Sequence, residues 1–136
     1  MPVPSATALA VIVPATDRPS TLGRCMAALR ASERSPEELI VQVEPAGSGP
    51  SLARNLGAAA CEAEVLVFVD SDVEVHPDAL ARIAERFAAD PELAATFGAY
   101  DDGPADRGIT SRYRNLLHHH VHAGAAGEAE TFWAGL

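Results

Sequence analysis

The chain has 136 residues, enough to bury a substantial apolar core, and we expect a single domain spanning 1–136. Its net charge is −9 and all its basic residues are Arg, a balance that argues against binding to a nucleic-acid backbone. No stretch reaches the roughly 18 apolar residues of a membrane span, and residues 6–15 lack the basic start of a signal peptide. We therefore expect a cytoplasmic protein, at most peripheral to the inner face of a membrane.

Short apolar runs alternate with helical patterns along the chain. Helices are expected after Ser20 or Thr21, over 51–60, from Pro77 and over 109–122. Strands are expected at 8–13, 39–43, 65–69 and 94–100, and a fifth apolar segment begins at Thr131. This alternation predicts an α/β fold with a mostly parallel sheet and helices on both faces.

The expected strand 65–69 is the most informative segment. Its five apolar residues indicate burial on both faces, and it leads directly into Asp70-Ser71-Asp72. Residues i and i+2 of an extended backbone point the same way, so Asp70 and Asp72 can converge at the edge where open α/β sheets bind ligands. Two such oxygen ligands suit Mg²⁺ or Mn²⁺, a metal that commonly carries a substrate diphosphate. The pair by itself also fits solvated carboxylates at a turn.

Other polar patterns have simpler interpretations. Cys25 and Cys61 lack metal-ligand spacing and are expected to be structural thiols rather than a disulfide. His118 and His122 could chelate a metal on one helix face, but no further ligand follows, which favours an acceptor-side or structural helix. The segment 47–49 (GSG) fits the start of a dinucleotide-binding loop, but no third Gly completes that motif.

Several segments, in this order, resemble the N-terminal part of family 2 glycosyltransferases, which have the GT-A fold. Residues 11–18 (VIVPATDR) are similar to the family's first strand and turn, and 51–59 (SLARNLGAA) to its ARN-x-G helix. Residues 68–80 (FVDSDVEVHPDAL) resemble its Asp-x-Asp strand end and next helix, and 113–119 and 131–135 resemble later parts of some bacterial members. The resemblance implies a GT-A, Rossmann-like sheet that is incomplete at the C-terminus.

The resemblance also implies an activity, a metal and a set of site residues. The activity would be transfer of a sugar from a UDP- or GDP-sugar to a glycan, a lipid-linked molecule or a small molecule, assisted by Mn²⁺ or Mg²⁺. Asp72 would be the main metal ligand, and Asp70 would ligate the metal or contact the donor. The other residues expected around the nucleotide sugar are Thr16, Asp17, Glu44, Arg54 and Ser71. Arg54 also fits a surface ion pair, and Asp17 also fits a helix cap.

Two departures from the family pattern bear on function. The second strand ends in Glu44 where the family usually has an Asp pair, so Glu44 would hydrogen bond to a base whose identity stays open. The general base of inverting members would lie beyond residue 136, so we expect the front part of a longer protein, without a residue here to fill that role. The alternatives are a truncated, non-catalytic nucleotide-binding or assembly module and a Rossmann-type dinucleotide binder.

Overall fold

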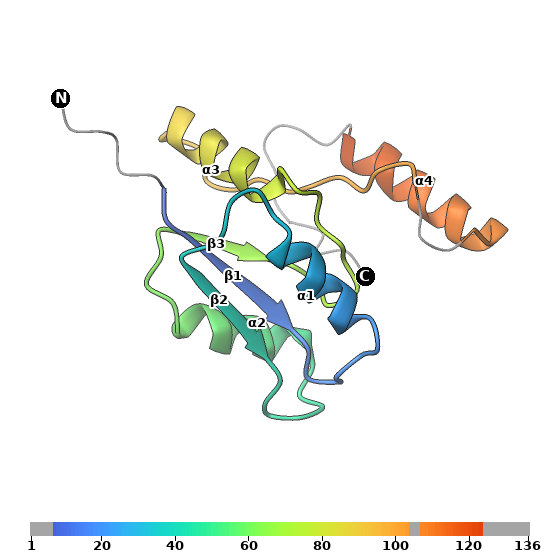
Figure 1. Cartoon of the computed structure of the whole chain (residues 1–136), viewed down its shortest axis with the longest axis horizontal. Helices are drawn as coiled ribbons and strands as arrows, with labels where there is room; N and C mark the ends of the chain where they lie inside the picture. The colour runs from blue at the N-terminus through green and yellow to red at the C-terminus, as the bar shows by residue number, and fades with distance from the viewer. Residues whose placement is uncertain (1–6, 104–106, 124–136) are drawn as a thin grey trace. The chain divides into compact units, whose positions relative to one another are not determined.

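The structure is a computed structural model that describes residues 7–103 and 107–123 (Figure 1). The chain divides into two compact units, Met1–Leu93 and Ala94–Leu136. The apolar segment expected from Thr131, including Trp133, lies outside the described residues, as do the side chains of His118 and His122.

The first unit is built on a three-stranded parallel sheet in the order β2-β1-β3. The strands are β1 (Leu9–Pro14), β2 (Glu38–Gln42) and β3 (Val65–Phe68). Ile12 of β1 lies opposite Ile40 of β2 on one side and Phe68 of β3 on the other. Every residue of β1 is buried, because this central strand is covered on both faces. The predicted α/β fold with a parallel sheet is confirmed.

Helices cover both faces of this sheet (Figure 1). Helix α1 (Leu22–Arg30) connects β1 to β2, α2 (Pro50–Ala59) connects β2 to β3, and α3 (Ala79–Ala89) follows β3. Cys25 and Leu29 of α1 and Leu80 and Ala84 of α3 form one core with alternate residues of β1 and β3. Helix α2 packs on the opposite face, where Gly57 lies against Ile12. The helices predicted after Thr21 and from Pro77 are therefore present, and both pack on the same face of the sheet.

Strand β3 differs from its prediction. Val65 and Val67 are buried, but Leu66 and Phe68 are exposed, so the strand is not buried on both faces. The reason is the position of α2, which packs over β1 and β2 and leaves the Leu66 and Phe68 side of β3 exposed. Helix α2 also faces the sheet with small residues, Ala53 and Gly57.

In the second unit, α4 (Ile109–Ala123) is the expected helix. The strand predicted over 94–100 is wrong, since this segment has no regular secondary structure. A strand requires a hydrogen-bonding neighbour, and within the described residues 94–100 pair with none. None of the helices in the described ranges combines the length and apolarity that crossing a membrane would require.

Candidate functional site

The carboxyl ends of the three parallel strands meet at one edge of the sheet, and the predicted site residues follow them there. From β1 the chain passes through α1 to β2 on one side and then through α2 to β3 on the other. The strand order therefore reverses at β1, which makes the carboxyl end of this strand a topological switch point, and open α/β sheets bind their ligands at such a point. Thr16 and Asp17 follow β1, Glu44 follows β2, and Asp70 follows β3.

An ion pair joins α2 to the end of β3. The Nη2 atom of Arg54 lies 2.5 Å from Oδ1 of Asp70, and the two side chains are only 21% and 26% exposed. The Nε atom of Arg54 is buried and has no hydrogen-bond partner within the described residues. A half-buried pair is less screened by solvent than a surface pair, so each charge depends more strongly on the other. The structure thus brings together two residues that the sequence placed at the donor site.

The backbone after Asp70 turns rather than continuing as a strand. The Val73 N–H donates to the Asp70 carbonyl over 3.0 Å, which places Ser71 and Asp72 in the middle of a four-residue turn. The expectation that Asp70 and Asp72 converge because the backbone is extended is therefore wrong. Asp70 is half-buried beside Arg54, whereas Asp72 is exposed. Within the described ranges, no group of three or more His, Cys, Asp or Glu side chains could hold a metal ion.

Cys25 contacts this turn from the face of the sheet that α1 covers, opposite the face on which α2 and Arg54 lie. Its thiol is fully buried and donates a long hydrogen bond, 3.6 Å, to the Asp70 carbonyl. Burial, and to a smaller extent the nearby negative charges of Asp72, Asp70 and Glu74, together raise the pKa of Cys25 to about 11. Cys25 is therefore a free, protonated thiol at neutral pH, as expected of a structural cysteine.

Because its pKa is raised in the folded state, Cys25 makes the free energy of unfolding fall at alkaline pH. The thiol ionises near pH 9.0 in the unfolded chain and near pH 11 in the folded protein. The stability that the protonated thiol contributes is therefore fully present below about pH 9 and is lost as pH rises through about 11. This loss amounts to roughly 2–3 kcal/mol. Urea denaturation across this range should show a shallower decline for Cys25→Ala than for the unsubstituted protein. The chain has no Lys to obscure the difference. Parallel declines in the two proteins would contradict the assignment.

Thr16 joins the turns that follow β1 and β2. Its side chain is buried, its carbonyl accepts the Gly47 N–H over 2.9 Å, and its hydroxyl accepts the Gly49 N–H over 3.2 Å. Gly47 and Gly49 both have positive φ, 71° and 90°, which only glycine adopts without strain. Thr16 therefore holds the short 45–50 loop against the edge of the sheet.

Glu44 is paired with Arg18, which was not among the predicted site residues. Its two carboxylate oxygens accept from Nη2 of Arg18 over 2.8 Å and from the Ala46 N–H over 2.9 Å. Both side chains of the Arg18–Glu44 pair are 64% exposed, so the pair is weak. Arg18 has a φ of 49°, and nothing in the local sequence signals this, because Arg is not enriched at positive φ. Asp17 lies exposed beside it.

The comparison with known protein families adds to this geometry. The family described as Glycosyl transferase family 2 matches residues 37–132, which run from β2 through α4 and include Glu44, Arg54, Asp70 and Asp72. The chain belongs to glycosyl transferase family 2. No curated protein and no solved structure matches it.

Membership of family 2 explains the architecture and gives the general function. The three parallel strands with helices on both faces are part of a GT-A, Rossmann-like fold. The general function of the family is glycosyl transfer, which requires a nucleotide-sugar donor and an acceptor. Thr16 and Asp17 lie outside the matched range, so their place in the site rests on the geometry of the β1 edge alone.

Proposed function

We propose that this family 2 glycosyltransferase binds a UDP- or GDP-sugar at the sheet edge between β1 and β3. In this proposal the sugar passes to a glycan, a lipid-linked molecule or a small-molecule acceptor. The observation that carries the proposal is the Arg54–Asp70 pair. It places a half-buried cation, whose Nε donor has no partner among the described residues, beside the turn that holds Asp72, at the switch point. A guanidinium group suits the phosphate oxygens of a nucleotide, because its planar set of N–H donors matches their geometry.

The base and ribose would lie toward the loops after β1 and β2. Thr16 and Asp17 would border the base, with Glu44 as a hydrogen-bond acceptor. Glu44 already accepts from Arg18 and from the Ala46 N–H. Because the Arg18–Glu44 pair is mostly exposed, exchanging it for a contact to the base would cost little, about 0–1 kcal/mol.

The donor set also fits a divalent metal that is shared with the substrate. Asp72 is exposed, and Asp70 uses one oxygen, Oδ1, for its bond to Arg54. Mg²⁺ and similar ions are commonly held by one or two carboxylates together with substrate phosphates and water, so the protein need not supply a third side chain. Asp72 would be the main ligand and Asp70 a direct or water-mediated one, with Ser71 between them. When bound, Mn²⁺ or Mg²⁺ would offset negative charge on the leaving diphosphate.

Calorimetric titration with UDP and with GDP, each with and without Mn²⁺, tests the donor proposal. We expect one nucleotide to bind more tightly when Mn²⁺ is present. Asp72→Asn should weaken this metal-dependent binding by at least about tenfold, because it removes the charged ligand. Glu85→Gln is the matched control, since it neutralises an exposed carboxylate on α3 and should leave the affinity unchanged.

Two results would count against this function in different ways. Nucleotide binding that does not depend on Mn²⁺, or that survives Asp72→Asn intact, would refute the metal site. Metal-dependent binding without sugar transfer or donor hydrolysis would support the alternative of a non-catalytic nucleotide-binding module.

A further inference from the structure

Helix α4 turns its polar side toward its own unit. The Asn115 side chain donates to the Asp101 carbonyl, and a ring nitrogen of His119 bonds the Tyr100 carbonyl. Ser111, Asn115 and His119 are spaced four residues apart, so they lie on one side of the helix, and all three are half-buried. A helix of a globular protein normally packs through its apolar side. In α4 this arrangement is reversed.

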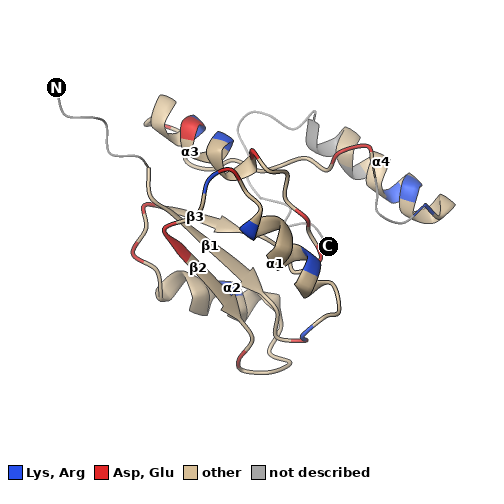
Figure 2. Ribbon diagram, in the orientation of Figure 1, with Lys and Arg blue, Asp and Glu red and all other residues tan. Residues whose placement is uncertain are grey.

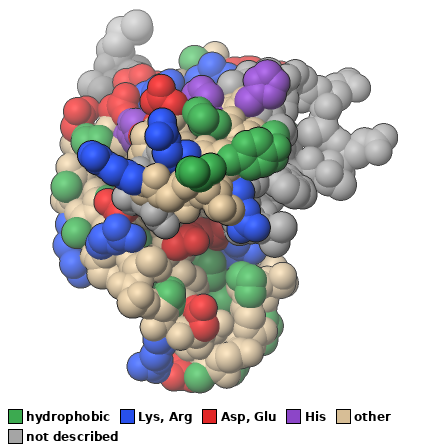
Figure 3. Space-filling model, turned by 90° about the vertical axis from the view of Figure 1, so that its right-hand side faces the viewer, with side chains coloured by type: hydrophobic (Ala, Val, Ile, Leu, Met, Phe, Trp, Pro, Cys, Tyr) green, Lys and Arg blue, Asp and Glu red, His purple; other side chains and the backbone are tan. Residues whose placement is uncertain are grey.

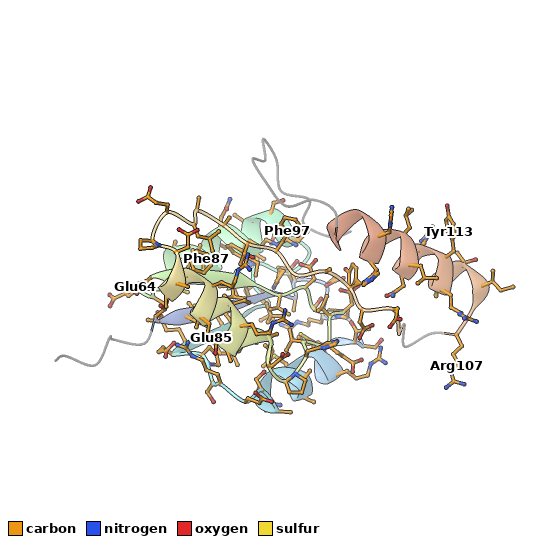
Figure 4. The ribbon with its side chains drawn as sticks, turned by 90° about the horizontal axis from the view of Figure 1, so that it is seen from above. Glu64, Glu85, Phe87, Phe97, Arg107 and Tyr113 are labelled. Atoms are coloured by element: carbon orange, nitrogen blue, oxygen red, sulfur yellow. The ribbon has the colours of Figure 1, made fainter. Side chains whose placement is uncertain are left out.

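Within the second unit, the apolar side of α4 is exposed. Ile109, Tyr113, Leu116 and Leu117 follow the i, i+4, i+7, i+8 spacing of a continuous helical stripe. The exposed fractions are 89% for Ile109 and 67% for Tyr113, and Leu116 and Leu117 are about half exposed. Tyr113 projects outward from the helix in Figure 4. We call these four residues the α4 stripe. Since exposed apolar area on this scale is unfavourable in water, the stripe calls for a partner.

Arg side chains border the α4 stripe, although the chain as a whole is acidic, and Asp101 lies on the opposite, polar side of the helix, where its carbonyl accepts from Asn115. Arg107, Arg112 and Arg114 lie on or next to the helix, and no Asp or Glu occurs between residues 107 and 123. Arg112 and Arg114 adjoin Tyr113 in sequence, so they project about 100° to either side of it and border the stripe. Figure 2 shows this basic character on α4, and Figure 3 shows green apolar side chains next to blue Arg and purple His side chains.

From this arrangement we infer that α4 is an interfacial helix that docks on an anionic lipid surface. An apolar stripe bordered by Arg lies in the plane of a membrane, with the stripe between the acyl chains and the guanidinium groups at the phosphates. The helix has 15 residues and a length of about 22 Å, which suits lying on a bilayer rather than crossing it. The acidic residues elsewhere in the chain oppose this binding only weakly where they lie more than about 10 Å from the lipid, because salt screens them. The inference is independent of which donor is bound.

Sedimentation of the full chain with lipid vesicles tests the inference. We expect binding to vesicles of phosphatidylcholine mixed with phosphatidylglycerol, little binding to phosphatidylcholine alone, and weaker binding as salt is raised. Arg112→Gln and Arg114→Gln should each lower the partition coefficient about fivefold. The double variant Tyr113→Ser with Leu117→Ser should abolish binding, because it removes the apolar area that enters the bilayer.

Two controls separate this role from a loss of folding. Arg86→Gln makes the same charge change on the exposed surface of α3 and should leave the partition coefficient unchanged. Circular dichroism should show the same helix content for every variant. Absence of vesicle binding, equal binding to neutral vesicles, or binding unaffected by Arg112→Gln would overturn the inference. Self-association in lipid-free buffer that depends on Tyr113 and Leu117 would also overturn it, since it would identify a second copy as the partner.

Discussion

Gly57→Ala should lower the free energy of unfolding by about 1–3 kcal/mol. A Cβ atom at this position would lie 2.5 Å from Cγ2 of Ile12, a fully buried residue at the centre of the sheet. Real Cβ atoms do not approach a neighbour this closely, so α2 would have to move away from β1 or Ile12 would have to leave its rotamer. Urea denaturation measures the change directly.

Gly23→Ala is the matched control for this prediction. Gly23 lies in α1, has no positive φ, and has nothing within 4 Å of the position that a Cβ would occupy. Alanine should therefore stabilise the protein there by up to about 1 kcal/mol, through its higher helix propensity. If Gly57→Ala also stabilised the protein, the close packing of α2 on β1 would be wrong.

Arg54→Ala is expected to cost about 1–3 kcal/mol of stability, between the values typical of exposed and of fully buried ion pairs. The substitution leaves the Asp70 carboxylate half-buried without the guanidinium that lies 2.5 Å away. Asp70→Ala should have a similar effect, because it leaves the Arg54 charge uncompensated. The double variant should lose less stability than the sum of the two single variants, and the difference is the coupling energy of the pair.

The same double-mutant cycle on Arg18 and Glu44 provides the comparison. Their atoms are almost as close, 2.8 Å, but both side chains are mostly exposed, so the coupling energy should be no more than about 1 kcal/mol. Equal coupling energies for the two pairs would show that burial at the end of β3 does not strengthen the Arg54–Asp70 pair.

The elements with clear local patterns could be predicted from the sequence. The three strands and the apolar stripes of α1 and α3 follow from runs and spacings that depend on the nearest neighbours in the chain. Predictions failed where a distant partner decides the outcome. Residues 94–100 have the composition of a strand, but a strand forms only beside another strand. Leu66 and Phe68 are apolar enough for a core, yet α2 does not cover them.

The candidate site shows the same division. The sequence placed Asp70 and Arg54 at one site by resemblance to the family, and the structure joins them in an ion pair. It gave no signal for Arg18, whose pairing with Glu44 links two turns that are far apart in the chain. An extended backbone was expected over 70–72, whereas the hydrogen bond from the Val73 N–H to the Asp70 carbonyl closes a turn there.

The sequence by itself determined the family, the order of strands and helices, and the carboxylates that follow β3. These properties depend on residue types and on short spacings, which a linear chain records directly. Only the tertiary structure decided which side chains pair with those carboxylates, which face of β3 is covered, and which side of α4 is exposed. Those properties depend on contacts between residues that are distant in the chain, and folding selects among many such contacts according to packing, burial and charge.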